Sequence, residues 1–276
     1  MNHTFLRFPD FRRKAVTLSY DDGVKYDRQL MEIMDRHGLK GTFNINSELF
    51  GDVPGGRRLT REEAVELYAN SPHEVAVHGA RHLSLDEVDA AAATADVIKD
   101  RENLERLFGR IIKGMAYANG SCSQKTAQIL ANCGIHYSRT TVSTECFSLP
   151  TDWLLMSATC HHENPRLMEL AKKFVETENV GYHWSNCPML FYLWGHSYEF
   201  NDKDNWHIIE DFAEYIGNRP DIWYATNGEI YDYVQAFDRL EYSADGKVIY
   251  NPTCTDLYLC YYGENVYVPG GQTVRL

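Results

Sequence analysis

The sequence predicts an α/β protein in which parallel strands form a barrel-like sheet with helices packed outside it. Short apolar runs alternate with amphipathic stretches for most of the chain. Strand–helix alternation of this kind is typical of parallel sheets. The length of 276 residues suits one such domain with a sizeable core and a small appendage.

The elements of the barrel follow from the periodicity of apolar residues. We predict strands at Ala15–Leu18, Gly41–Ile45, Glu74–Val77, Lys113–Tyr117, His136–Arg139, Val180–Trp184, Met189–Leu193 and Ile222–Tyr224. Helices are predicted at Val24–His37, Thr60–Ala69, Leu85–Phe108, Ser123–Ala131, Pro165–Glu178, Asp204–Gly217 and Gly228–Phe237. Thr60 and Glu63 have the spacing of a capping box, and Gly38 and Gly109 follow their helices as C-cap glycines.

The pattern changes at about Asp238, where short β-rich segments replace the alternation. These segments are Lys247–Tyr250, Asp256–Tyr262, Asn265–Val268 and Thr273–Leu276, separated by glycine-containing hairpin turns. We therefore expect a barrel domain over residues 1–237 and a small antiparallel appendage over 238–276, packed on the barrel. A module that contacts carbohydrate is the alternative interpretation of the appendage.

The composition excludes several classes of partner. A net charge of -12 argues against nucleic acid or an anionic membrane surface. No apolar run approaches the length of a membrane span, and the N-terminus lacks a basic start followed by an apolar segment. The seven cysteines form no C-x-x-C pair, which argues against a disulfide framework or a zinc knuckle. We expect a cytoplasmic protein.

Two strings of polar residues stand directly after predicted strands, and they carry the chemistry. They are Ser-Tyr-Asp-Asp-Gly at 19–23 and His-Gly-Ala-Arg-His at 78–82. One carboxylate and two imidazoles suit Zn²⁺ or another divalent first-row metal. The second aspartate is then free for proton transfer. The alternative is that Asp-Asp-Gly is only a turn and that the histidines are ordinary surface or core residues.

These strings resemble the first two motifs of the polysaccharide deacetylase (NodB-homology, carbohydrate esterase) family, T-F-D-D-G and H-[ST]-x-x-H. The resemblance implies a distorted (β/α) barrel of about seven parallel strands. It also implies a metal-dependent hydrolase that removes an acetyl group from an N-acetylated amino sugar or oligosaccharide. Carried over by position, Asp21 is the general base, and Asp22, His78 and His82 hold the Zn²⁺ or other divalent metal.

Two later strings resemble the last motifs of the family. Leu-Trp-Gly-His at 193–196 is similar to L-x-H with one extra residue, which makes His196 the general acid. Thr-Asp-Trp at 151–153 is similar to the D-W motif. There Asp152 would orient His196, and Trp153 would wall the acetyl pocket. The alternatives are a hydrogen-bonded core histidine at 196 and a chain turn at 152.

The third motif of the family, R-P-P-Y-G, is degenerate here. Residues 115–120 occupy its place, and Ala116 stands where the family has an arginine that holds the catalytic aspartate. We predict that Arg139, on the next strand, substitutes by contacting Asp21; an ion pair with a helix is the alternative. The loop is expected to offer the backbone N–H of Asn119 to an oxyanion. Substrate contacts are predicted for Trp153, Trp194 and Tyr117.

Three other functions are compatible with these residues. The same architecture also hydrolyses O-acetyl esters and some non-sugar amides. Non-heme Fe(II) oxygenases use two histidines and one carboxylate, but strand–helix alternation disfavours their usual jelly-roll sheet. A non-catalytic carbohydrate-binding protein that retains the metal is the third. The Cys-His-His string at 160–162 is expected to make hydrogen bonds rather than a second metal site.

Overall fold

The computed structural model describes residues 4–51, 56–178 and 186–276. The predicted strand at 180–184 therefore lies outside the described residues. One sheet forms the core of the fold, and its neighbouring strands run parallel. Its strands are β2 (Lys14–Asp21), β3 (Gly41–Ile45), β4 (Glu74–Val77), β5 (Gly114–Ala116), β6 (Tyr137–Ser143), β7 (Met156–Ala158), β8 (Cys160–His161), β9 (Met189–Gly195) and β10 (Ile222–Tyr224).

The sheet closes into a distorted barrel through one short segment. The strand order is β7-β6-β5-β4-β3-β2-β9-β8. Only Thr159 separates β7 from β8, yet β7 pairs with β6 and β8 pairs with β9. Residues 156–161 therefore join the two edges of the sheet. If β7 and β8 are counted as one strand, seven parallel strands form the barrel, as predicted. β10 pairs in addition with the first residues of β2.

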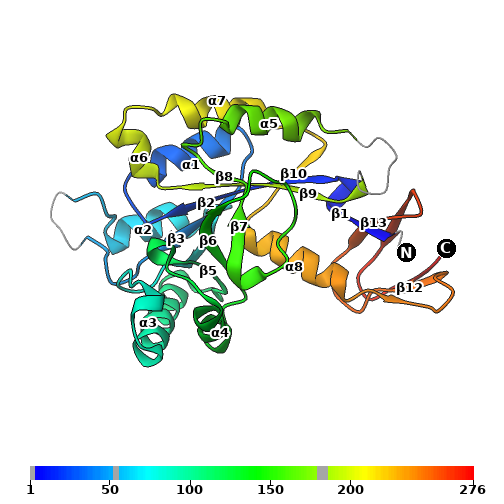
Figure 1. Cartoon of the computed structure of the whole chain (residues 1–276), viewed down its shortest axis with the longest axis horizontal. Helices are drawn as coiled ribbons and strands as arrows, with labels where there is room; N and C mark the ends of the chain where they lie inside the picture. Colours follow the sequence, from blue (N-terminus) through cyan, green and yellow to red (C-terminus); the bar gives the residue numbers. More distant parts are fainter. Residues whose placement is uncertain (1–3, 52–55, 179–185) are drawn as a thin grey trace.

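Helices cover the outside of this barrel. Figure 1 shows α5 and α7 along one side of the sheet and α3 and α4 on the other. The eight α-helices of the described residues are α1 (Asp27–Arg36), α2 (Arg61–Tyr68), α3 (Ala90–Phe108), α4 (Gln124–Asn132), α5 (Leu167–Glu176), α6 (Ser197–Asp202), α7 (His207–Ile216) and α8 (Asn227–Asp238). Four short 3₁₀ turns accompany them: η1 (Pro9–Phe11), η2 (Leu85–Glu87), η3 (Ala118–Gly120) and η4 (Trp153–Leu155).

Local chemistry explains where helices begin. The predicted capping box is present: the Thr60 hydroxyl accepts from the backbone N–H of Glu63, whose carboxylate accepts from that of Thr60. The helix predicted from Leu85 onward is interrupted, because Asp89 caps α3 by accepting from the backbone N–H of Ala92 at 2.9 Å. The residues before this cap form η2 instead.

Successive side chains of β2 face alternately the outer core under the helices and the barrel interior. Val16, Leu18 and Tyr20 are buried in the cluster that packs under the helices. Thr17 and Ser19, which alternate with them, are buried and polar. Because these interior side chains of β2 are polar, their hydrogen bonds must be satisfied within the barrel.

The start of α8 satisfies many of these bonds and closes the amino end of the barrel. The Asn227 side chain accepts from Thr17 Oγ1 at 3.0 Å and donates to the Tyr192 hydroxyl at 2.7 Å. The backbone N–H of Gly228 donates to Glu74 Oε2 at 2.9 Å. The opposite, carboxyl end of the barrel is left for the strand-end motifs.

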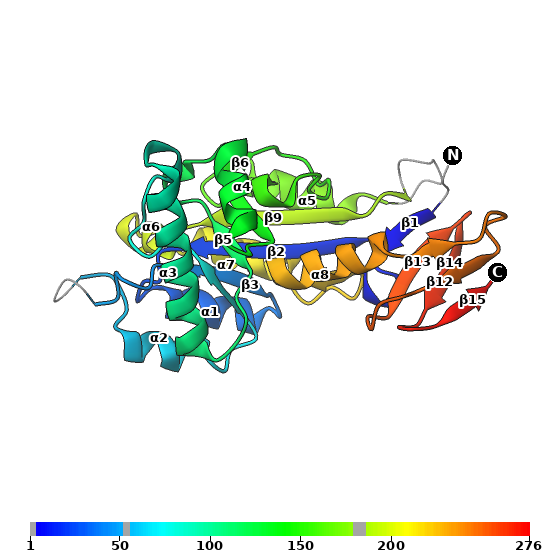
Figure 2. The ribbon, with the colours of Figure 1, turned by 90° about the horizontal axis from the view of Figure 1, so that it is seen from below.

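A β-rich appendage follows α8 and includes strands from both the first and the last part of the chain. It has two three-stranded sheets, β1-β13-β14 and β11-β12-β15. Figure 2 shows them together at one end of the molecule, with the N- and C-termini beside them. The strands are β1 (Thr4–Arg7), β11 (Glu241–Tyr242), β12 (Val248–Tyr250), β13 (Leu257–Tyr261), β14 (Glu264–Val268) and β15 (Thr273–Arg275). The pairing of β1 with β13 extends the appendage beyond the predicted 238–276. Where the domains divide stays a prediction.

Within the described residues, no helix is both long enough and apolar enough to span a membrane.

Candidate active site

The carboxyl ends of three strands bring the motif residues to one place. In the sheet register Asp21, the last residue of β2, pairs with Asn44 of β3, and Tyr20 pairs with Gly195 of β9. The backbone N–H of His78, just after β4, donates to the Ile45 carbonyl at 3.2 Å. Functional groups of parallel α/β barrels sit at this edge.

The three predicted metal ligands face one another. Oδ1 of Asp22 lies 3.6 Å from Nε2 of His82 and 3.9 Å from Nε2 of His78. Asp22 and His82 both have left-handed backbone conformations, with φ of 87° and 59°. Non-glycine residues adopt this region at some cost and often do so at functional sites.

The protonation of the two histidines fits metal binding. Nδ1 of His78 lies 2.8 Å from the Ala116 carbonyl, so it carries the proton and leaves the lone pair on Nε2. This Nε2 is buried and has no hydrogen-bond partner among the described residues. Burial, helped by the nearby His78, lowers the pKa of His82 to about 4. Neutral imidazoles are the form that binds a metal.

Arg58 also contacts the ligand set, and no sequence pattern indicated it. Its Nη2 lies 3.1 Å from Asp22 Oδ1, and its Nη1 donates to the Asp22 carbonyl. Nη1 also donates to Asn46 Oδ1 at 2.6 Å, and Asn46 Nδ2 donates to the carbonyls of His78 and Gly79. Arg58 thus links the loops that carry the ligands.

Asp21 is a buried carboxylate held by neighbours on other strands. Arg139 Nη2 donates to its Oδ2, and Asn44 Nδ2 donates to its Oδ1 at 2.8 Å. Burial raises the pKa of Asp21, but the charge and hydrogen bond of Arg139, helped by His196, outweigh burial and lower the pKa to about 2. The contact predicted for Arg139 is therefore present, and it keeps Asp21 ionised.

His196 lies across from Asp21, with its Nε2 3.9 Å from Asp21 Oδ2. Its Nδ1 lies 3.2 Å from Glu199 Oε2, and its backbone N–H donates to the same oxygen at 3.1 Å. Burial lowers the pKa of His196, but Glu199 and Asp21 outweigh it, so the pKa is raised. The imidazole is thus held with Nε2 toward Asp21 and favoured in its protonated form.

The partner of His196 is a correction to the sequence analysis. Asp152 is exposed, and its carboxylate accepts from the backbone N–H of Leu154 at 3.0 Å and from Gln124 Nε2 at 3.3 Å. It caps η4 rather than orienting His196. The signal for Glu199 is the His-x-x-Glu spacing, because a carboxylate at the third position of a helix reaches back to the residue before the helix.

Residues 9–138 match the family model described as polysaccharide deacetylase. This part of the chain is similar to that family. The match covers the strand ends that carry Asp21, Asp22, His78 and His82, but not His196 or Glu199.

Curated relatives of the family align over short stretches. A probable peptidoglycan-N-acetylglucosamine deacetylase from Arthroderma benhamiae is 30% identical over 87 residues, which are 31% of this chain and 18% of that protein. A chitin deacetylase from Pestalotiopsis sp. is 24% identical over 129 residues, 46% of this chain and 41% of that protein. The chain thus spans less than half the length of either relative.

A solved structure has a similar fold over a longer range of the chain. A protein from Mycobacterium smegmatis, named for the polysaccharide deacetylases, aligns with a TM-score of 0.61 at 17% identity. The alignment covers 84% of this chain and 94% of that one. The predicted distorted (β/α) barrel is confirmed.

The loop that replaces the third family motif starts beside the ligands, since Ala116 accepts from His78. Asn119 lies in η3 with φ 56° and is exposed, and its side chain donates to Ser84 Oγ at 3.1 Å. The backbone role of Asn119 stays a prediction.

Tyr117 is buried and its hydroxyl donates to the Leu154 carbonyl at 3.0 Å. This hydrogen bond is structural and does not support a substrate contact.

The two tryptophans that were predicted to contact substrate lie in different surroundings. Trp194 lines the site: the Arg139 guanidinium lies 4.4 Å from its ring centroid, and the His196 ring lies 6.0 Å away. Trp153 packs edge-on against Tyr231 of α8, with centroids 5.2 Å apart. Tyr231 also contacts Tyr137, the first residue of β6. Trp153 thus belongs to the packing between η4 and α8, which does not support the predicted acetyl pocket there.

The histidine pair after β8 lies beside Glu199, the carboxylate partner of His196. Nε2 of His161 is 3.2 Å from Glu199 Oε2. His162 is fully buried and stacks on Phe200 with centroids 4.1 Å apart. Burial, with the nearby His161, lowers the pKa of His162 to about 3. His162 is therefore neutral and buried, and its Nε2 lies 3.3 Å from the same Glu199 oxygen. Both histidines thus border the site.

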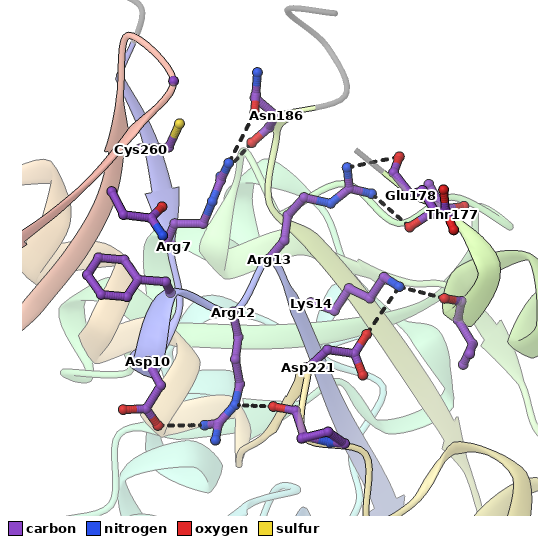
Figure 3. A pocket seen from close by; sticks show the side chains of 15 residues that line it. Arg7, Asp10, Arg12, Arg13, Lys14, Thr177, Glu178, Asn186, Asp221 and Cys260 are labelled. Carbon is purple, nitrogen blue, oxygen red and sulfur yellow. Dashed lines mark hydrogen bonds and ion pairs between the residues drawn. The ribbon is translucent and has the colours of Figure 1, made fainter. Parts of the chain in front are cut away.

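A cavity of about 630 Å³ lies at the opposite end of β2, between the barrel and the appendage. Four cationic side chains line it, and Figure 3 shows each with a partner. Arg7 donates to Asn186 and Arg12 pairs with Asp10, while Arg13 and Lys14 donate to main-chain carbonyls around 175–178. Because Lys14 opens β2 and Asp21 ends it, this cavity is separate from the candidate active site.

Proposed function

We propose that this protein is a metal-dependent hydrolase that removes the acetyl group from an N-acetylated amino sugar or oligosaccharide. The observation that carries the proposal is the order of groups at the barrel edge. Asp21 lies between the trio Asp22, His78 and His82 on one side and His196 on the other, 3.9 Å from the Nε2 atoms of both His78 and His196. The names of both curated relatives support an N-acetylated substrate.

The trio would hold Zn²⁺ or another divalent first-row metal through Asp22 Oδ1 and the two Nε2 atoms. When bound, such an ion polarises the acetyl carbonyl and makes a water molecule easier to deprotonate. This assignment is supported by the donor set itself, in which Nε2 of His78 is buried and has no hydrogen-bond partner among the described residues.

Asp21 acts as the general base. Its Oδ2 accepts the proton of the attacking water, and the contacts from Arg139 and Asn44 fix the carboxylate while this happens. A pKa of about 2 means that the base is ionised at any working pH. The cost is weaker basicity, which the adjacent metal would offset by making the water more acidic.

His196 acts as the general acid. Its Nε2 gives a proton to the departing amino nitrogen, and Glu199 on Nδ1 stabilises the imidazolium before transfer. A positioned imidazole typically contributes ~10²–10⁴-fold to the rate. The oxyanion of the tetrahedral intermediate would be stabilised by the metal charge and by a backbone N–H at Asn119.

The test is acetate release from N-acetylglucosamine oligomers by the metal-loaded protein, with metal content measured on the same sample. We expect release by the wild type. His78→Ala should lose most of the metal and the activity, because one of three ligands is gone. His207→Ala, an exposed histidine on α7, is the matched control and should keep both. Release only from O-acetylated sugars, or full metal and activity in His78→Ala, would contradict the proposal.

A further inference from the structure

Three nitrogens donate to one carboxylate oxygen beside the proposed acid. Oε2 of Glu199 lies 3.2 Å from Nδ1 of His196, 3.1 Å from its backbone nitrogen and 3.2 Å from Nε2 of His161. Nε2 of His162 lies 3.3 Å from the same oxygen but makes no hydrogen bond among the described residues. The general acid therefore shares its carboxylate with a second imidazole. These contacts lower the pKa of Glu199 against the opposing effect of burial, so the carboxylate is ionised.

The hydrogen bonds of His161 show which of its nitrogens carries the proton. The backbone N–H of Glu163 donates to Nδ1 of His161 at 3.2 Å. Nδ1 is therefore an acceptor, and the proton of the ring is on Nε2, which faces Glu199. A histidine that binds a metal through Nε2 carries its proton on Nδ1. His161 is thus a donor to Glu199 and not a ligand of a second metal.

The His161 ring is held in this orientation by aromatic neighbours. It stands edge-on to Trp194 with centroids 4.5 Å apart, and it lies 4.4 Å from the ring of His162. Only 22% of its side chain is exposed. The ring therefore presents a fixed donor to Glu199.

We propose that His161 is a positioning residue that acts through Glu199 and thereby fixes the orientation of His196. The donor on His161 holds the Glu199 carboxylate on the first turn of α6, where its Oε2 meets Nδ1 of His196. This inference rests on the proposed function, because it assigns a support to the proposed general acid.

Sharing the carboxylate also moderates its effect on His196. Part of the Glu199 charge is taken up by the hydrogen bond from His161, so His196 experiences less of it than in a simple pair. Removal of the His161 donor should therefore raise the pKa of His196 and loosen its orientation. The other titratable and charged groups that face this pair are Asp21, Asp22, His162, Glu163, Tyr198 and Lys203.

Two variants separate the donor from the ring. His161→Phe keeps an aromatic ring against Trp194 but has no donor, whereas His161→Gln keeps an N–H donor at about the position of Nε2. We expect His161→Phe to lower kcat by ~10-fold, part of what a general acid supplies, with unchanged metal content. We also expect it to raise the pKa of His196, measured by NMR titration of the metal-free protein. His161→Gln should recover most of kcat and the wild-type titration, and His207→Phe should change neither.

The NMR titration keeps the two proposals distinguishable. If the wild type releases no acetate, the proposed function fails, while the titration of His196 still decides the role of His161. The inference is overturned if His161→Phe leaves both kcat and the His196 titration unchanged, or if His161→Gln behaves like His161→Phe. If His161→Gln behaves like His161→Phe, packing of the ring rather than its N–H donor supports His196.

Discussion

Asp21 shows at the scale of one residue how neighbours decide the state of a buried group. It is 2% exposed, and burial alone would favour its neutral form. Arg139, 118 residues further along the chain, donates to it through a guanidinium that is fully buried. An arginine on a strand that does not neighbour β2 thus makes this contact, and the carboxylate stays charged.

The Arg139 contact predicts a shift in the pH dependence of the reaction. Arg139→Ala should raise the pKa of Asp21, because the positive charge that favours its ionised form is lost. The base then protonates at higher pH, so the acid limb of the kcat/KM profile should move upward, with lower kcat and unchanged metal content. Arg139→Lys should recover only part of the loss, since an ammonium cannot make the same set of contacts. A profile identical to that of the wild type in Arg139→Ala would refute this role.

Glu199→Gln should shift the alkaline limb of the pH–rate profile, and it should shift that limb to lower pH. Glu199 raises the pKa of His196, and the acid must be protonated to act. Loss of the charge lowers that pKa, so the alkaline limb of the kcat profile should move to lower pH and kcat should fall. The pH–rate profile of the metal-loaded variant measures this. A shift to higher pH, or none, would mean that Glu199 does not support the acid.

Single residues differ in how far the sequence reveals them. Asp21, Asp22, His78 and His82 follow strands in recognisable strings, so local pattern was enough to bring them together. Arg58 and Glu199 depend on where loops and a six-residue helix pack, and Asp152 matched a short string while lying elsewhere. A two-residue string carries little information about its tertiary surroundings.

At the scale of an element, the start of α1 contains a buried carboxyl group. Asp27 is fully buried and accepts from the Tyr68 hydroxyl, the Ser197 hydroxyl and the backbone N–H of Val24. Burial outweighs these bonds and raises the pKa of Asp27 to about 7. A raised pKa contributes stability that is fully present below the unfolded value of ~4 and is lost as the pH rises through about 7.

Asp27→Asn should remove this pH dependence. The amide can keep the three bonds by donating to Ser197 and accepting from the other two groups, yet it cannot ionise. Relative to the wild type, the free energy of unfolding of Asp27→Asn should therefore be larger, meaning a more stable protein, at pH 8 than at pH 5. Urea unfolding at both pH values measures this, with the exposed Asp211→Asn of α7 as control. An equal difference at the two pH values would count against a raised pKa.

Strands and helices were predictable where the residue pattern of the segment itself determines its secondary structure. β3, β4 and β10 have the predicted bounds, because each is a short run of strand-forming residues. β7 and β8 were missed since residues 156–161 mix small and polar side chains, and their pairing follows from barrel closure. α6, with six residues, is too short for helical periodicity to show.

At the scale of the whole molecule, the fold and the site are separable. One apolar cluster lies between the barrel and its helices, and a second joins the barrel interior to α8 and the appendage. Neither cluster contains a candidate metal ligand. Variants of the site should therefore fold, and their loss of activity can be assigned to chemistry.

The most direct test of the account compares acetate release by the wild type and Asp21→Asn at equal metal content. Asparagine keeps the shape of the side chain but cannot accept the proton of the attacking water. We predict one metal ion per chain in both proteins, acetate release from N-acetylglucosamine oligomers by the wild type, and a loss of ~10²-fold or more in Asp21→Asn. Turnover of Asp21→Asn at the wild-type rate, with the metal bound, would contradict the account.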